Sequence, residues 1–138
     1  MTTDKALRFN SGKPEVHYIL FYKKFLEAFA SVQSQGALKY GYGNWMYGGK
    51  PDSEYFDAGM RHLITHFLAT KGLADPDTGE LCSYYDKDMG VLHIAQAIWN
   101  FMQLIELNLD MPVMNPEFDQ NEFVERWKSQ PKNEAFNR

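Results

Sequence analysis

The sequence predicts a small all-α protein, a helical bundle of about four helices with an aromatic, glycine-rich loop between the first two. Apolar residues recur at helical spacing in several segments, and no segment alternates apolar and polar residues as a strand would. Glycine and proline clusters separate these segments. One domain is expected over residues 1–138, with an N-terminal arm at 1–13 and a frayed tail at 131–138.

The first helix is expected from about Pro14 to about Gln35, because proline suits a first helical turn and apolar residues follow at helical spacing. Gly36 would end or bend this helix. Four glycines and a proline then fall within residues 39–52, which indicates a loop. A loop so rich in rings and glycines is either a packed cover or a lid over a ligand.

A second helix is expected from Ser53, a good N-cap, to Gly72, a good C-terminal stop. A third helix, from about Asp88 to about Asn108, is apolar over most of its circumference and is therefore expected at the centre of the bundle. A shorter polar helix follows over residues 116–129. The buried stripe expected on the second helix consists of Phe56, Met60, Leu63, Ile64, Phe67 and Leu68.

The charge and cysteine content exclude several classes of protein. A net charge of −4 disfavours a binder of duplex nucleic acid, whereas metal ions can bridge an acidic protein to a phosphate ester. Cys82 is the only cysteine, so no disulfide is expected within the chain, as in a reducing cytoplasm. Residues 1–9 lack the apolar core of a signal peptide, and polar residues interrupt the apolar segment 91–107, so no membrane span is expected.

A polar stripe on the third helix is the most informative feature of the sequence. At 100° per residue, Gly90, His93, Ala97 and Asn100 fall within roughly 80° of one another. Unpaired burial of His and Asn would cost a few kcal/mol, so both side chains need partners. The stripe is either a satisfied core network or the wall of a ligand site in which small residues make room.

Acidic residues precede the third helix. Asp86 and Asp88 either cap the helix or, with His93 nearby, form a site for Mg²⁺ or Mn²⁺. Asp75 and Asp77 in the preceding segment are rivals for the same role. The choice between the two pairs stays open at this point.

The second helix and the aromatic loop carry further candidates. Asp57 and Arg61 share a helix face, either as an intrahelical ion pair on a solvated surface or as part of a site. In the loop, Lys39 can neutralise a phosphate, Asn44 can read a base edge and Trp45 can stack on a base. The alternative is that Trp45 only pins the loop to the bundle.

Four segments follow one another over residues 8 to 107. They are Arg8-Phe9-Asn10-Ser11-Gly12-Lys13-Pro14, Lys39-Tyr40-Gly41 with Asn44-Trp45, Asp57-Ala58-x-x-Arg61-His62-Leu63, and His93-x-Ala95-x-Ala97-x-x-Asn100. Together and in this order they resemble phage dATP/dGTP diphosphohydrolases, in particular the MazZ branch of the MazG-like all-α pyrophosphohydrolases. These enzymes accompany phage systems that replace adenine by 2-aminoadenine in DNA.

The resemblance implies a helical homo-oligomer, a dimer or a tetramer, in the cytoplasm of the phage host. It implies hydrolysis between the α and β phosphates, with Mg²⁺ or Mn²⁺ held by carboxylates. For the MazZ branch it implies dGTP, and also GTP, as substrate. The dGMP product would feed synthesis of the 2-aminoadenine nucleotide.

Residue roles follow from the resemblance together with the chemistry of the side chains. The expected metal ligands are Asp57, Asp86 and Asp88. The residues expected to act in catalysis, by binding the ion, offsetting phosphate charge or orienting water, are Asp57, Arg61, His62 and His93. The residues expected to bind substrate are Lys39, Asn44, Trp45 and Asn100.

The chain departs from the pattern of these enzymes at two places. The larger superfamily carries Glu-Glu-x-x-Glu and Glu-x-x-Asp helices, and only Glu54-x-x-Asp57 matches either. An Asp-x-Glu-Ser/Thr-Gly segment is expected before the helical histidine. Residues 75–79 match its residue types and residues 86–93 match its spacing, which favours Asp86 and Asp88 as ligands.

Three alternative functions stay open. The enzyme could be directed at dATP rather than dGTP. An HD-domain hydrolase would release triphosphate, but that class needs a His-Asp dipeptide, and no histidine here precedes an aspartate. A phage module without enzymatic activity could bind a host partner through the aromatic loop.

Overall fold

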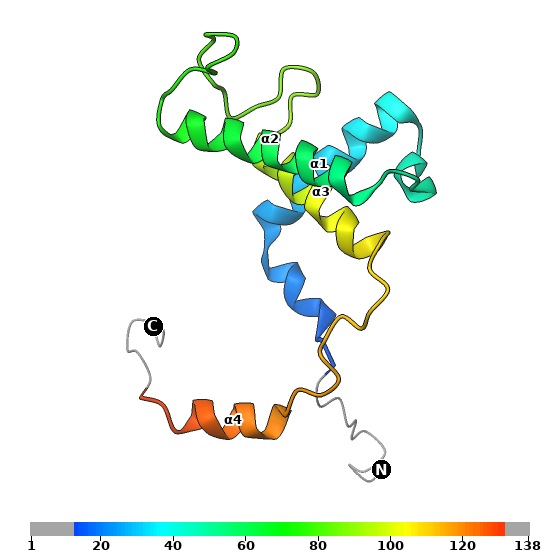
Figure 1. The fold of residues 1–138 in the computed structure, drawn as a ribbon, viewed down its shortest axis with the longest axis vertical. Coiled ribbons are helices and arrows are strands. Elements are labelled where there is room, and N and C mark those ends of the chain that lie inside the picture. Colours follow the sequence, from blue (N-terminus) through cyan, green and yellow to red (C-terminus); the bar gives the residue numbers. More distant parts are fainter. Residues whose placement is uncertain (1–12, 132–138) are drawn as a thin grey trace. The chain divides into compact units, whose positions relative to one another are not determined.

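A computed structural model describes residues 13–131, and its regular elements are all helical (Figure 1). Between these residues there are no strands, only two isolated bridges, which confirms the all-α prediction. The predicted arm and tail lie outside the described residues, apart from the positions at their inner ends. The elements are η2 (Val16–Phe21), α1 (Lys23–Tyr40), η3 (Asn44–Tyr47), α2 (Asp52–Thr70), α3 (His93–Glu106) and α4 (Gln120–Lys128), where η denotes a 3₁₀ helix.

The described residues fall into two compact units, and the expectation of one domain over residues 1–138 stays a prediction. One unit, His17–Asp110, contains α1, α2 and α3. The other contains, among the described residues, 13–16 and 111–131, including α4. In α4 the Asp119 carboxylate caps the helix by accepting the N–H of Glu122 at 2.9 Å. None of the helices among the described residues is both long and apolar enough to cross a bilayer.

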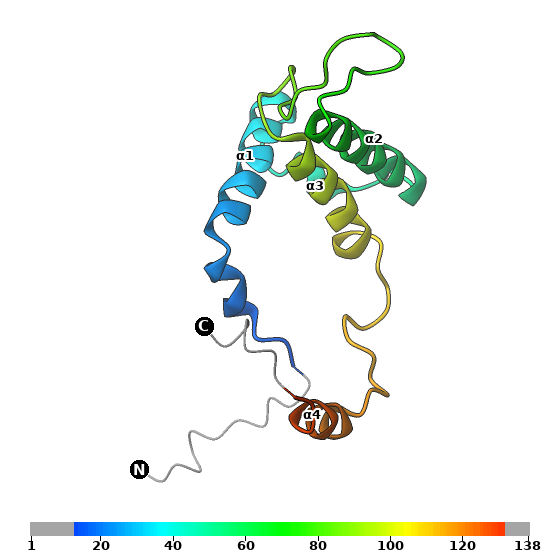
Figure 2. The same ribbon diagram turned by 90° about the vertical axis from the view of Figure 1, so that its left-hand side faces the viewer.

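Helix α3 packs against both α1 and α2, as expected for a central helix (Figures 1 and 2). Small residues allow this close packing, since Ala95 and Ala97 are buried on α3. Val32 of α1, Val91 and Ala95 form the core cluster. On α2, Gly59 lies against the ring of Phe101, so the absence of a side chain at this position leaves room for the ring.

Three of the helices differ from the prediction at their ends, and α4 begins at Gln120 rather than at residue 116. Helix α1 begins at Lys23 and continues through Gly36 to Tyr40, while residues 16–21 form the 3₁₀ helix. Helix α3 begins at His93 rather than Asp88, because residues 86–92 form a turn. Gly90 has φ +74° and is not helical, so it does not belong to the polar stripe.

The stripe expected to be buried on α2 is largely exposed. The exposed fraction of the residue is 51% for Phe56, 44% for Met60, 51% for Ile64 and 56% for Phe67. The face turned toward α3 is instead the one that carries Tyr55, Gly59 and His62, at helical spacing. The apolar periodicity of α2 was therefore correct, but much of the stripe lies on the surface of this unit, and Phe56 contacts the Phe101 ring of α3 at a centroid distance of 6.3 Å.

Candidate functional site

Two consecutive turns connect α2 to α3. In the first loop, residues 73–82, one carboxylate oxygen of Asp75 accepts the N–H groups of Asp77 at 2.7 Å and Thr78 at 3.3 Å. The N–H of Gly79 donates to the Asp75 carbonyl at 2.8 Å. The turn needs a left-handed residue at its end, and Gly79 supplies it with φ +74°.

The second loop, residues 84–93, repeats this turn eleven positions later (75 to 86). The Oδ1 atom of Asp86 accepts the N–H groups of Asp88 at 2.6 Å and Met89 at 3.4 Å. The N–H of Gly90 donates to the Asp86 carbonyl at 2.7 Å, and Gly90 also has φ +74°. Each loop is closed by an antiparallel bridge, Ala74–Leu81 in the first and Tyr85–Leu92 in the second.

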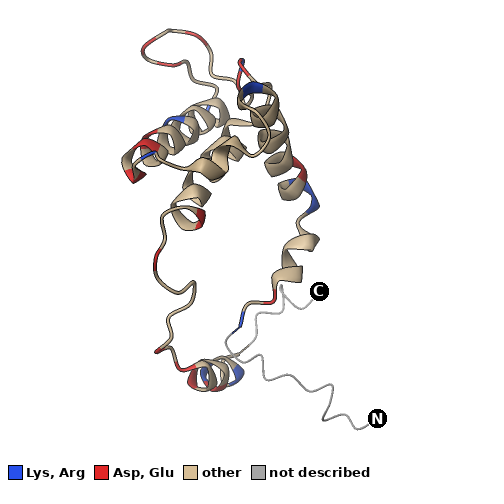
Figure 3. Cartoon of the chain, turned by 90° about the vertical axis from the view of Figure 1, so that its right-hand side faces the viewer, with Lys and Arg blue, Asp and Glu red and all other residues tan. Residues whose placement is uncertain are grey.

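The repetition explains why two stretches of sequence competed for one role. Both read Asp-x-Asp-x-Gly-x-Leu, over 75–81 and 86–92, an internal repeat that the sequence analysis missed. Acidic positions accordingly mark both loops (Figure 3). The two loops end in different residues. In the second loop the N–H of the last residue, His93, donates to the Tyr84 carbonyl at 2.9 Å. In the first loop the N–H of the last residue, Cys82, donates to the Leu73 carbonyl.

Three side chains from separate elements converge beside the second loop. They are His62 of α2, Asp86 of the second loop and His93 at the start of α3, and we call them the metal cluster. One potential ligand atom from each lies within 4.8 Å of the other two. The Nδ1 atoms of His62 and His93 are 2.9 Å apart, and all three residues are partly buried.

The electrostatics of the metal cluster favour cation binding. Burial raises the pKa of Asp86, but hydrogen bonds from the N–H groups of Asp88 and Met89 and from the Gln96 side chain outweigh it and lower the pKa overall. Burial lowers the pKa of His62, and neighbouring His93 lowers it further. Burial also lowers the pKa of His93. Near neutral pH the acid is ionised and the imidazoles are neutral, as metal ligands must be.

The second loop is fastened to α1 by two side chains one helical turn apart. Gln35 donates its amide to the Met89 carbonyl at 2.7 Å, and the Lys39 ammonium bonds the Asp88 carboxylate at 2.5 Å. The bond to Asp88 raises the pKa of Lys39 above its usual value. The predicted phosphate ligand and a predicted metal ligand therefore bond to each other in this structure.

The two predicted residues earlier on α2 are not members of the metal cluster. Asp57 is exposed and stands five residues before His62, about 140° around the helix, so the two side chains leave α2 on different sides. Arg61 is also exposed, and its charge contributes to the lowered pKa of His62. The structure thus brings together Asp86, His62 and His93 but not Asp57.

A cavity of about 710 Å³ adjoins the metal cluster. Its walls come from α1, the aromatic loop, α2 and α3, and His62 belongs both to the walls and to the metal cluster. Of the residues predicted to bind substrate, Asn44, Trp45 and Asn100 line it, whereas Lys39 does not. The volume lies within the usual range for small-molecule sites.

Two further residues lining this cavity were not singled out from the sequence. Gln96, 3% exposed, hydrogen-bonds Asp86, and its Oε1 atom has no partner among the described residues. The indole N–H of Trp99 also has none. Gln96 lies at i+3 from His93, so helical spacing alone could have added it to the polar stripe.

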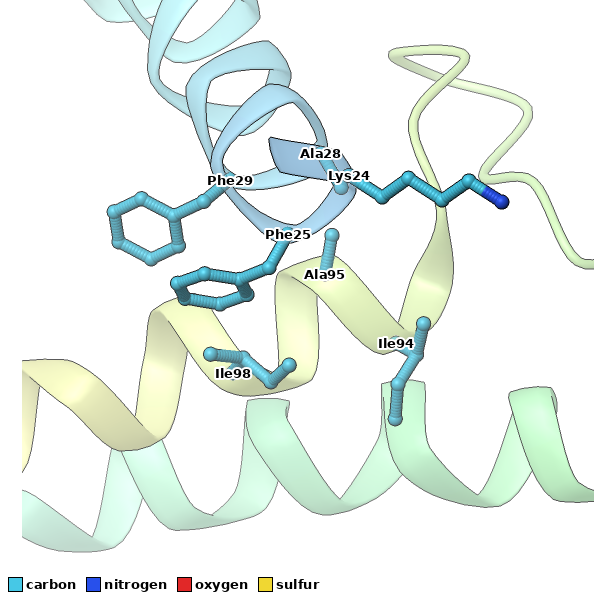
Figure 4. Close-up of a pocket in the computed structure, with 7 residues that line it drawn as sticks. All are labelled: Lys24, Phe25, Ala28, Phe29, Ile94, Ala95 and Ile98. Carbon is cyan, nitrogen blue, oxygen red and sulfur yellow. The ribbon is translucent and has the colours of Figure 1, made fainter. Parts of the chain in front are cut away.

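A second, apolar pocket of about 200 Å³ lies between α1 and α3 (Figure 4). The rings of Phe25 and Phe29 on α1 face Ile98 of α3 across it, while Lys24 extends away. It contains no group that could act on a polar ligand apart from this lysine.

Comparison with known proteins supplies the family. A family model described as dATP/dGTP diphosphohydrolase, N-terminal, matches residues 3–117 and so covers α1, α2, α3 and both loops. No curated protein and no solved structure matches the chain. Because the family match extends over most of the 138 residues, the chain belongs to the dATP/dGTP diphosphohydrolase family.

Proposed function

We propose that this protein hydrolyses a purine deoxynucleoside triphosphate at the metal cluster, with the base in the adjoining cavity. The observation that carries the proposal is the position of His62, which contacts His93 in the cluster and also lines the cavity. A nucleotide with its base among Trp45, Asn44 and Asn100 would extend its phosphates toward His62. Ring stacking on Trp45 and hydrogen bonds from the two amides would recognise the base.

The residues that would hold the divalent ion, Mg²⁺ or Mn²⁺, are those of the metal cluster. They fit because an ionised carboxylate and two neutral imidazoles converge there. When bound, the ion offsets the charge of the triphosphate and lowers the pKa of a water that attacks the α-phosphorus. Asp57 and Asp88 stay predicted ligands: Asp88 would first have to leave Lys39, and Asp57 would have to act from the exposed side of α2.

The cations near the cluster would bind the phosphates. Lys39 is 44% exposed and pairs with Asp88, so a phosphate could replace that carboxylate without burying an unpaired charge. Arg61 is exposed beside His62 and would meet the outer phosphates. Cleavage between the α and β phosphates would release a monophosphate and pyrophosphate.

The resemblance to the MazZ branch supports dGTP as substrate, with GTP as a second one. The dGMP formed in the cytoplasm of a phage host would then feed synthesis of the 2-aminoadenine nucleotide. A homo-oligomer, dimer or tetramer, is part of the same proposal. It is supported by the exposed stripe of Phe56, Met60, Ile64 and Phe67, since side chains of this kind in a row favour association.

The activity is tested by incubating the purified chain with Mg²⁺ or Mn²⁺ and each nucleoside triphosphate, with products separated by chromatography. We expect dGMP and pyrophosphate from dGTP, and no product after chelation. Release of triphosphate would contradict the proposed bond cleavage, and dAMP as the main product would contradict the substrate. No turnover of any nucleotide would overturn the proposal and favour a binding module.

The duplicated turn offers a matched pair of variants. Asn retains an oxygen that can accept the two N–H bonds of the turn but removes the charge, so Asp86→Asn and Asp75→Asn perturb the two loops in the same way. We expect Asp86→Asn to lose roughly 100-fold or more in kcat/KM, and Asp75→Asn to stay within about twofold. Equal effects in the two variants would remove the metal cluster from the mechanism.

A further inference from the structure

We infer that Lys50 determines base specificity, by donating hydrogen bonds to the oxygen at position 6 of guanine, so that the cavity accepts a 6-oxopurine in preference to adenine. The inference rests on the proposed function, because it concerns the base of the same substrate. The feature that carries it is a lysine in the wall of the large cavity, a residue to which the proposed hydrolysis gives no role.

The two helices that flank the cavity fix its length. Helices α2 and α3 run antiparallel, since the cluster histidines meet at one end and the Asn108 amide donates to Asp52 at the other. Tyr55 lies seven residues before the α2 histidine, and Asn100 lies seven residues after the α3 histidine. Seven residues rise about 10 Å along a helix and return to nearly the same face. Because Tyr55 and Asn100 both line the cavity, its far end lies about 10 Å from the cluster histidines.

Lys50 is held at this far end by Tyr55. The Nζ atom of Lys50 lies over the Tyr55 ring, 5.8 Å from its centroid, and both residues line the cavity. Tyr55 is only 4% exposed, so the ring that supports the ammonium group is itself fixed by packing. Among residues 13–131 no acidic side chain pairs with Lys50, so its N–H groups stay available to a ligand.

The hydrogen-bonding character of lysine determines which purine it accepts. An ammonium group offers three donors and no acceptor. Guanine presents two neighbouring acceptors, O6 and N7, whereas adenine carries an amino group, a donor, at position 6. With guanine, Lys50 would pair with an acceptor, and with adenine it would face another donor. The same lysine therefore favours one base and disfavours the other.

The position of Lys50 favours the base over the phosphates as its ligand. In a nucleotide whose phosphates lie at the metal cluster, the sugar separates them from the base, so the base reaches toward the far end of the cavity. Lys39 and Arg61 are the cations beside the cluster. Among the described residues that line the cavity, Lys50 is the only lysine, arginine, aspartate or glutamate. A single donor group of this kind at the base end can discriminate between purines.

The experiment compares kcat/KM for dGTP, dITP and dATP in the parent and in Lys50→Met, which keeps an apolar side chain but removes the donors. The parent should prefer dGTP and dITP, which both carry O6, over dATP. This preference should narrow by roughly tenfold or more in the variant. If dITP behaved like dATP in the parent, O6 would not be recognised and the inference would be overturned. An equal loss for all three nucleotides would place Lys50 on the triphosphate and would also overturn it.

A second lysine on an aromatic ring provides a matched control. Lys71 lies over the Phe67 ring, 5.6 Å from its centroid, at the other end of α2 and outside the cavity wall. Lys71→Met should keep the preference of the parent, and Lys50→Arg, which retains the donors, should keep it as well. A narrowing in Lys71→Met as large as in Lys50→Met would overturn the inference.

Binding of the products separates failure of the inference from failure of the proposed function. Calorimetric titration with dGMP and dAMP requires no hydrolysis. Turnover of dGTP with an unchanged preference in Lys50→Met would overturn the inference alone. Tighter binding of dGMP than of dAMP that is lost in Lys50→Met, without turnover of any triphosphate, would overturn the proposed function alone and leave a guanine-binding site.

Discussion

Replacement of the first loop tests whether only one copy of the duplicated turn builds the site. Ala74 and Leu81 pair in an antiparallel bridge, so residues 75–80 form a loop whose two ends lie side by side. A two-residue Asn-Gly turn is the usual connection between strands paired in this way. We therefore consider a variant in which residues 75–80 are replaced by Asn-Gly, with the second loop unchanged.

The expected change in stability is small because opposing contributions nearly cancel. Residues 75–80 are exposed apart from the partly buried Asp75, and their one ion pair, Glu80 with Lys87, is a surface pair worth about 0–1 kcal/mol. Shortening the connection from six residues to two (75 to 80 replaced by Asn-Gly) recovers about 1 kcal/mol of loop-closure entropy. The free energy of unfolding should therefore change by no more than about 1 kcal/mol.

The assay combines urea unfolding, Mn²⁺ titration and dGTP turnover on the same preparation. Metal affinity and kcat/KM should stay within about threefold of the parent, because all three cluster residues lie outside the replaced segment. A folded variant that no longer binds Mn²⁺ would refute the reasoning, since the first loop would then contribute to the site. A loss of several kcal/mol would show that the first loop supports the unit.

Further predictions concern Gln96, the contact between α2 and α3, and pH. Gln96→Leu should weaken metal affinity by about 10–100-fold, because the hydrogen bond to Asp86 is lost. The free energy of unfolding in urea should stay close to that of the parent. Unchanged metal affinity would show that Gln96 contributes only to packing. Gly59→Ala would place a Cβ 2.7 Å from the Phe101 Cζ atom and should lower the free energy of unfolding by about 1–2 kcal/mol. Gly36 has open space around the position of a Cβ, so Gly36→Ala should raise the free energy of unfolding by up to about 1 kcal/mol in the same measurement. Both cluster histidines have a pKa below 6.5 in the fold, so the unfolded chain takes up protons first as the pH falls. Urea unfolding of the metal-free protein should therefore give a stability that is constant well above pH 6.5, falls as the pH drops through 6.5 toward the lowered pKa values, and loses no more from these two groups below them. A stability that rises on acidification over that range would contradict these shifts.

The helices could be predicted because their signals are local. Helical spacing and glycine or proline boundaries placed α2 within two residues of its observed ends, from Asp52 to Thr70. Which face of α2 meets α3 could not be predicted in the same way. Helix packing is decided by fit as well as by hydrophobicity, and Gly59 opposite the Phe101 ring offers the closer fit, so the more apolar face stays exposed.

The candidate site shows the same division between local and long-range information. Trp45, Asn44 and Asn100 were predicted from their chemistry, and all three line one cavity. The pairing of Lys39 with Asp88 was not predicted, because it joins residues 49 positions apart. From residue type, Lys39 was predicted to bind phosphate and Asp88 to bind the metal ion. Only the tertiary structure could show that the two side chains form an ion pair with each other.

The duplicated turn carries this argument furthest, since identical local structure leads to different chemistry. Asp75 and Asp86 make equivalent bonds within their turns, and Gly79 and Gly90 share the same backbone conformation. What separates the copies is their surroundings: Gln35 and Lys39 fasten the second loop to α1. The second loop also ends in His93 opposite His62, where the first ends in Cys82. The turn is thus a way to hold a carboxylate still, and the elements facing that carboxylate determine whether it becomes part of a metal site.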